Sequence, residues 1–236
     1  MATADLHEKT ITMVPKETWE QEYSVFHAIP SSLRTEPAKA LVLFADLLNL
    51  KNKRVMDAGC GNGRNAVYLA NRGCEVTAVD FAEAALTETQ RRADTAGVKN
   101  RVSVDKVDLS AMLPYASNSF DFVLDAYTFC HFLNEALATA FWTEMRRIAG
   151  PDGYLMSISF SVDDSYYARL RSGDGSKIVF DPTNRISKRL YEETELKGFF
   201  SRLFRIEYFV KFEFEDSVHG QSFKRVVFAS ILRREQ

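Results

Sequence analysis

The chain has few cysteines, no long apolar run and no strong charge of either sign. Its three cysteines, Cys60, Cys74 and Cys130, show no Cys-x-x-Cys spacing, so we expect neither a metal site nor a disulfide framework. No run of about 18 apolar residues is present, and the first sixteen residues lack the apolar core of a secretory signal. The formal net charge of −2 gives no electrostatic reason to expect nucleic acid as a partner. These absences predict a cytoplasmic protein that binds no metal, membrane or nucleic acid.

The length and composition fit one globular domain. The chain has 236 residues, of which 46% are hydrophobic and 26% charged, which is ordinary for a soluble domain with a full core. We expect a flexible N-terminal tail over residues 1–17 and a single domain over 18–236. Within that domain, residues 18–50 should form two leading helices. Residues 161–187 interrupt the pattern as a long polar insertion, which is typical of a functional loop or a disordered one.

Apolar strands and amphipathic helices alternate through the rest of the domain. Strands are expected at 55–57, 74–80, 101–108, 120–125 and 154–160, with a turn at 150–153 before the last of them. Helices are expected from residue 66 and at 82–96, 135–149 and 188–200. Such alternation predicts a parallel, doubly wound α/β sheet with helices on both faces. Two further strands, 204–215 and 222–232, are joined by the short link of residues 216–220 and must be antiparallel.

A glycine turn follows the first strand, in the run Asp57-Ala-Gly-Cys-Gly-Asn-Gly63. Its Gly-x-Gly-x-Gly spacing differs from the Gly-x-Gly-x-x-Gly that places a pyrophosphate on a helix N-terminus, since Arg64 stands where the third dinucleotide glycine would be. The second strand ends in Asp80, whose carboxylate is placed to accept hydrogen bonds from the two hydroxyls of a ribose. The pattern therefore predicts a nucleoside-type cofactor without a pyrophosphate.

On these residues the chain resembles the class I S-adenosylmethionine-dependent methyltransferases, and its glycine turn looks particularly like the tellurite-resistance branch. The resemblance implies a Rossmann-like, seven-stranded sheet, S-adenosyl-L-methionine as cofactor and S-adenosyl-L-homocysteine as product. Two of these acids also have a structural alternative, because Asp57 could cap the turn that follows it and Asp108 could cap a helix or turn. The cofactor-binding residues that it implies are Asp57, Gly59, Cys60, Gly61, Gly63, Asn65, Asp80, Phe81, Asp108, Leu109 and Asp125.

Methyl transfer from a sulfonium depends mainly on holding the nucleophile in line with the methyl group. A general base is needed only when the nucleophile arrives protonated. The candidates are His131 and Tyr127, just beyond the fourth strand, together with His27 and the tyrosines of the insertion. His131 could instead be a packed core histidine. That strand is followed by Asp125-Ala-Tyr-Thr128 and not by the Asn/Asp-Pro-Pro-aromatic run of nucleobase amino methyltransferases, so we expect a small-molecule acceptor.

Two other functions stay open at this point. One is methylation of a soft acceptor such as a thiol, selenium or tellurium species; the other is a non-catalytic cofactor-binding or partner protein with the same fold. The resemblance implies a lid over the cofactor in residues 18–50, where plain packing against the sheet is the alternative. The expected lid residues are Trp19, Tyr23, Phe26, His27, Tyr166, Tyr167 and Arg169. A homodimer is left open.

Overall fold

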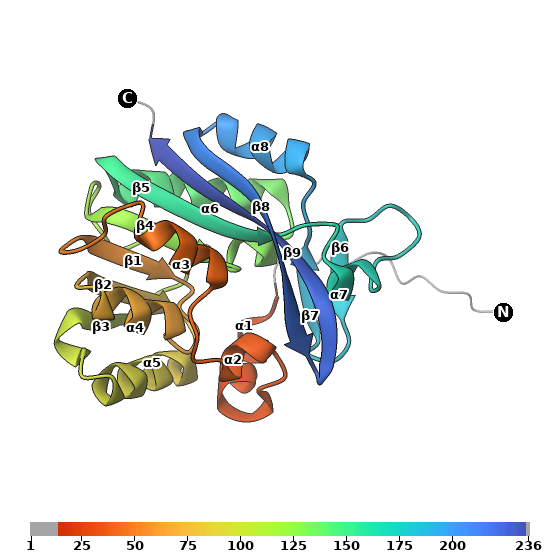
Figure 1. The fold of residues 1–236 in the computed structure, drawn as a ribbon, viewed down its shortest axis with the longest axis horizontal. Helices are drawn as coiled ribbons and strands as arrows, with labels where there is room; N and C mark the ends of the chain where they lie inside the picture. The colour runs from red at the N-terminus through yellow and green to blue at the C-terminus, as the bar shows by residue number, and fades with distance from the viewer. Residues whose placement is uncertain (1–13, 235–236) are drawn as a thin grey trace.

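A seven-stranded sheet forms the centre of the protein in the computed structural model, which describes residues 14–234. The strand order is β3-β2-β1-β4-β5-β9-β8. Five strands run parallel, namely β1 (Arg54–Ala58), β2 (Glu75–Asp80), β3 (Val102–Lys106), β4 (Phe120–Ala126) and β5 (Ala149–Phe160). The last two, β8 (Phe204–Val218) and β9 (Gln221–Arg234), are antiparallel. The predicted doubly wound sheet with a C-terminal antiparallel hairpin is confirmed (Figure 1).

Helices cover both faces of this sheet because neighbouring strand residues point to opposite sides. Val55 packs in one apolar cluster with α3 (Lys39–Ala45), α4 (Arg64–Asn71) and α5 (Glu83–Thr95). Met56, the next residue, packs in a second cluster with α6 (Glu135–Ile148) and α8 (Glu193–Ser201). The order of the strands reverses beside β1, so the carboxyl ends of β1 and β4 border the crevice where α/β sheets bind ligands.

The insertion contains more regular structure than we expected. It holds a short helix, α7 (Ser165–Ala168), and a separate antiparallel pair of strands, β6 (Ile178–Asp181) and β7 (Ile186–Arg189). The helix expected from residue 188 is wrong in its first part, because Ile186–Arg189 pair with β6 and α8 begins only at Glu193. The two strands enclose a tight turn in which Asp181 accepts the Thr183 N–H and Arg185 adopts a φ of 59°, and this turn commits the flanking residues to a hairpin.

Two expected connections are shorter than predicted. Strands β8 and β9 extend to Val218 and Gln221, leaving a two-residue turn of His219 and Gly220 with φ of 50° and 76° in place of a link over 216–220. Two successive positive φ angles match the twist of an antiparallel pair. The turn expected at 150–153 belongs to β5, whose pairing with β4 shifts register there.

The N-terminal segment is helical but broken twice. It consists of α1 (Lys16–Gln21), a π-helical turn η1 (Glu22–Phe26) and α2 (Pro30–Leu33). The first of the two leading helices expected in residues 18–50 is interrupted at His27, whose φ of 46° ends the π-helical turn. The buried carboxylate of Glu22 accepts the backbone N–H groups of Ala28 and Ile29 and stabilises the break. Residues 1–13 of the expected tail over 1–17 lie outside the described residues. The last two residues of the expected tail belong to α1, which begins at Lys16.

Two 3-10 turns, η2 (Lys99–Arg101) and η3 (Phe129–His131), complete the described elements. Over residues 14–234 none of the helices has the length and apolarity needed to cross a membrane.

Candidate functional site

The glycine turn after β1 brings its backbone into close contact with neighbouring side chains. The N–H groups of Gly59 and Cys60 both donate to the carbonyl of Val79, at 2.8 and 3.0 Å, and so tie the turn to the end of β2. Gly59, Gly61 and Gly63 have φ of 75°, 54° and 77°, a region that side-chain-bearing residues rarely adopt. A Cβ on Gly59 would lie 2.2 Å from Thr128 Oγ1, and one on Gly61 would lie 2.4 Å from Tyr23 Oη. The turn therefore has no room for larger residues.

Asp80 holds this turn from the end of the second strand. One carboxylate oxygen accepts the Gly61 N–H and the other accepts the Ala82 N–H, both at 3.0 Å. Burial raises the pKa of Asp80, although these backbone donors oppose the shift. The residue lines a cavity, and each carboxylate oxygen keeps a second lone pair for a hydroxyl donor.

Asp57 is the other acid of the motif, and it lies behind the turn at the end of β1. It is buried, and neither carboxylate oxygen makes a well-formed hydrogen bond to another described residue. Burial raises its pKa to about 7, against the opposing effects of the Arg64 guanidinium and the Ala66 N–H. A buried carboxylate without a satisfied partner is costly and is typical of a functional site.

The end of β3 contributes Asp108, which sits at one end of the cavity with Phe81, Leu109 and Ser110. Its carboxylate accepts the N–H and hydroxyl of Ser110 and pairs with Lys16 of α1 at 2.5 Å. Partial burial would raise the pKa of Asp108, but the hydrogen bonds from Lys16 and Ser110 outweigh it and lower the pKa. The N-terminal segment therefore reaches across to the third strand.

At the end of β4, Asp125 is turned inward. Its oxygens accept the N–H groups of Thr128 and Phe129 and the hydroxyl of Ser157, and burial raises its pKa to about 7. This carboxylate fixes the sharp bend at which Tyr127 adopts a φ of 71°. The Tyr127 ring is thereby directed into the cavity, where it stacks on Phe160 at 4.7 Å.

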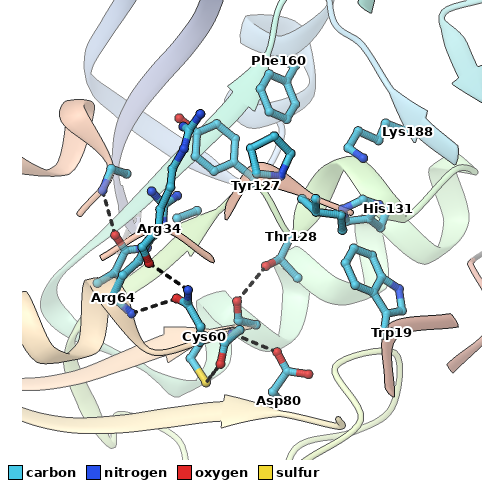
Figure 2. A pocket seen from close by; sticks show the side chains of 18 of the residues that line it. Trp19, Arg34, Cys60, Arg64, Asp80, Tyr127, Thr128, His131, Phe160 and Lys188 are labelled. Carbon is cyan, nitrogen blue, oxygen red and sulfur yellow. Dashed lines mark hydrogen bonds between the residues drawn. The ribbon is translucent and has the colours of Figure 1, made fainter. Parts of the chain in front are cut away.

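A cavity of about 360 Å³ joins these features (Figure 2). Its volume is that of a small-molecule site. Asp80 and the glycine turn lie at one end, and Phe160, Lys188 and His131 lie at the other, with Tyr127 between them. The expected site residues on its wall are Trp19, Tyr23, Gly59, Cys60, Gly61, Asn65, Asp80, Phe81, Asp108, Leu109, Tyr127, His131 and Tyr167.

Several expected site residues do not lie on this wall. Asp57, Gly63 and Asp125 stand behind it, where Gly63 caps the start of α4 and the two acids are buried. Among the expected lid residues, Phe26 and His27 are exposed to solvent. Tyr166 donates its hydroxyl to Asp181, and Arg169 stacks over the Tyr166 ring at 4.4 Å. These two residues brace the insertion and do not face the cavity.

The His131 side chain is partly buried, and contacts on two sides fix its orientation. Its Nδ1 lies 3.2 Å from the carbonyl oxygen of Ser187 on β7, and its ring meets Trp19 edge-on at 4.6 Å. A carbonyl oxygen only accepts, so this contact places the proton on Nδ1 and leaves the Nε2 lone pair free of it. Burial, and then the charge of Lys188, lower the pKa of His131 well below its ordinary value. The imidazole is therefore neutral near pH 7.

Sequence reasoning missed several cavity residues outside the glycine motif, and the polar ones include Arg34, Thr128, Lys188 and Arg225. Arg34 pairs with Asp216 of β8 at 2.7 Å, and Thr128 donates to the carbonyl of Ala58 at 2.9 Å. Arg225 could have been found from the sequence, since it immediately precedes the apolar run of β9 and begins its buried stretch. No comparable indication was present for Lys188, because the pattern around it predicted a helix and not the strand β7.

No group of three or more His, Cys, Asp or Glu side chains suited to hold a metal ion occurs within residues 14–234.

The fold is that of the Rossmann-like methyltransferases. Residues 55–153 match a family described as "Methyltransferase domain". The solved 1,6-didemethyltoxoflavin-N1-methyltransferase of Burkholderia thailandensis superimposes with a TM-score of 0.65 at 19% identity, over 92% of this chain and 88% of that one.

Curated relatives match over shorter spans. A malonyl-[acyl-carrier protein] O-methyltransferase of Enterobacter lignolyticus is 32% identical over 51% of this chain and 44% of its own length. An S-adenosyl-L-methionine-dependent Diels-Alderase of Neonectria sp. is 33% identical over 42% and 41%. The chain thus spans less than half the length of these relatives. The shared part agrees with the resemblance to class I methyltransferases and does not single out the tellurite-resistance branch.

Proposed function

We propose that this protein transfers a methyl group from S-adenosyl-L-methionine to a small-molecule acceptor. The observation that carries the proposal is the glycine turn of residues 59–63, tied by its N–H groups to β2 and to Asp80 at the wall of a cavity. The named methyltransferases among its relatives and structural neighbours support the same reaction.

The residues present fit this cofactor. The buried carboxylate of Asp57 has no well-formed partner, the turn leaves no space for a Cβ, and Asp80 keeps lone pairs for ribose hydroxyls. Asp80 would hold the ribose, Asp108 with Leu109 and Phe81 the adenine, and the glycine turn the methionine portion. When bound, the cofactor supplies an activated methyl group on a sulfonium.

The chain's own residues then position the acceptor. Tyr127, fixed by the inward carboxylate of Asp125, and Trp19 would hold the acceptor, while Nε2 of His131 would take its proton. We further propose that residues 18–50 and the insertion form the lid over this site.

The test of the cofactor site is calorimetry on Asp80→Asn, which keeps an oxygen for the Gly61 N–H but removes the charge. Losing a charged acceptor costs about 1.5–3 kcal/mol, so affinity for S-adenosyl-L-methionine and S-adenosyl-L-homocysteine should fall about ten- to a hundredfold. The matched control is Asp121→Asn. Asp121 lies near the start of β4, away from the cavity, and pairs with Arg54, so this variant should bind the cofactor normally. Unchanged affinity in Asp80→Asn, or preference for NAD, would refute the assignment.

A second candidate function is a cofactor-dependent reaction without methyl transfer. It is favoured by the Diels-Alderase among the relatives. Detection of S-adenosyl-L-homocysteine as a product separates the two, because only methyl transfer forms it. A third candidate is methylation of a thiol, selenium or tellurium species, which needs no base when the acceptor arrives as an anion.

A further inference from the structure

Two buried cations stand at the acceptor end of the cavity. Lys188 is 3% exposed, and its Nζ makes no hydrogen bond within the described part of the chain. Arg225 is 6% exposed and donates Nε–H to Asp164 at 2.7 Å, but its Nη2 likewise has no acceptor among the described residues. Both residues line the cavity, and Figure 2 shows the Lys188 side chain running toward its centre. A buried ammonium without an acceptor is strongly disfavoured unless a ligand supplies one.

The acids nearest to Lys188 are already engaged. Asp181 accepts the Tyr166 hydroxyl, the Asn184 amide and the Thr183 N–H. Glu22 accepts two backbone N–H groups of the N-terminal segment. These carboxylates act on Lys188 only at a distance, and Arg225 adds repulsion. Within residues 14–234 these carboxylates therefore leave no anion in hydrogen-bonding contact with the Lys188 Nζ.

Aromatic rings surround the two cations. Lys188 Nζ and Arg225 Cζ lie 5.4 and 5.2 Å from the centre of the Tyr167 ring, and Arg225 lies 5.1 Å from that of Phe160. Phe160 in turn stacks on Tyr127. This combination of cationic donors and flat apolar walls fits a planar molecule with one anionic group.

We propose that the acceptor is a planar organic acid whose carboxylate binds to Lys188 and the free Nη2 of Arg225, with its ring against Tyr127 and Phe160. The inference rests on the proposed function, since it names the acceptor class of the same site. It goes beyond that function by assigning recognition to two residues outside the cofactor motif.

The carboxylate serves as an anchor and is not itself methylated. Transfer of CH3 to a carboxylate oxygen would give a neutral ester and leave the buried Lys188 without a counter-charge, which is unfavourable, whereas Arg225 would keep its pair with Asp164. The methyl group goes instead to a second nucleophilic atom of the acceptor. That atom forms the bond to carbon as the sulfonium bond breaks, and its proton passes to Nε2 of His131. Lys188 and Arg225 thus act as specificity residues.

The experiment compares acids with their neutral amides. Benzoate and indole-3-carboxylate are titrated by calorimetry against benzamide and indole-3-carboxamide, with cyclohexanecarboxylate as the non-planar acid. Each titration is run on the protein alone and on protein saturated with S-adenosyl-L-homocysteine. We expect the planar acids to bind about ten- to a hundredfold more tightly than their amides, as for a hydrogen bond to a charged group.

Lys188→Met, which keeps the length and apolar stem of the side chain, should abolish this preference. Its affinity for S-adenosyl-L-homocysteine should be unchanged, and its melting temperature should rise because a buried charge is removed. Lys211→Met is the matched control, since Lys211 is an exposed lysine of β8 that pairs with Asp163 at 2.7 Å. This variant should retain the wild-type preference for acids.

The proposal is overturned if the wild-type protein binds acids and amides equally, binds none of them at millimolar concentration, or keeps its preference in Lys188→Met. Equal binding of cyclohexanecarboxylate and benzoate would overturn the statement that the acceptor is planar. Failure to bind S-adenosyl-L-homocysteine refutes the proposed function separately, because the acid preference is also measured without it.

Discussion

Single side chains at the end of β4 and on β7 set the chemistry available to the acceptor. Nδ1 of His131 is engaged by the Ser187 carbonyl, so the ring presents one nitrogen as an acceptor. Its burial keeps the imidazole neutral to well below pH 6.5. A neutral imidazole needs no deprotonation before it can take a proton, so His131 should not limit turnover on the acid side of neutrality.

We therefore expect His131→Ala to lower turnover about 10²–10⁴-fold while cofactor affinity stays the same. The wild-type rate should show no His131-dependent decline between pH 7 and 6, because the neutral form exists above a pKa that is lowered. Turnover over that pH range, with S-adenosyl-L-methionine binding measured alongside, checks both statements. The control is His219→Asn in the exposed turn of β8 and β9. If His131→Ala keeps most of its turnover, the acceptor is a soft anion that needs no base.

Secondary-structure elements remote in sequence meet at the cofactor end through one acid. Glu20 of α1 accepts the N–H groups of Glu83 and Ala84, at 2.7 and 3.2 Å, and so caps the first turn of α5. Helix α5 has no side-chain cap of its own. Together with the Lys16–Asp108 pair, this contact holds the N-terminal segment over Asp80 and the glycine turn.

Loss of such a cap costs about 0.5–2 kcal/mol. We expect Glu20→Ala to speed hydrogen exchange in residues 14–26 and to weaken S-adenosyl-L-homocysteine binding several-fold, because the segment that covers the cofactor becomes looser. Glu17→Ala, at an exposed acid of the same helix, should change neither. Hydrogen exchange followed by mass spectrometry, with and without S-adenosyl-L-homocysteine, measures both. Identical exchange in the two variants would show that α1 is held by other contacts.

The strands differ in how well the sequence predicts them. Strands β1, β2 and β4 are short apolar runs bounded by turns, and their buried faces leave little choice of structure, so they were predicted well. The glycine spacing and Asp80 were equally informative, because backbone geometry requires those residue types. The hairpin of β6 and β7 was missed, because its four-residue strands alternate too briefly to be told from a helix. Lys188 and its place in the cavity depend on that hairpin and on contacts remote in sequence.

At the scale of the whole molecule, two acids buried behind the cavity wall lower the stability of the fold when they are charged. Two buried carboxylates, Asp57 and Asp125, both have pKa values raised to about 7, in each case chiefly by burial. They differ in their partners, because Asp125 accepts three hydrogen bonds and Asp57 has no well-formed one. An acid whose pKa is raised on folding binds its proton more tightly in the native state. The contribution of these two groups to the free energy of unfolding therefore falls as the pH rises from about 4 to 7.

Asp57→Asn removes the buried charge and should raise the free energy of unfolding above pH 7. A shift from 3.8 to about 7 corresponds to about 4 kcal/mol at most, and we expect about 2–4 kcal/mol. The gain should shrink as the pH falls toward 4, where the wild-type carboxyl group is protonated as well. Asp125→Asn also removes a buried charge, but it should be less stable than Asp57→Asn at every pH, because an amide cannot accept all three donors. Urea unfolding of both variants from pH 4 to 8 tests this contrast. If the stability gain in Asp57→Asn did not depend on pH, its origin would be packing. The glycine turn would then not have a buried charge behind it that a ligand could pair with.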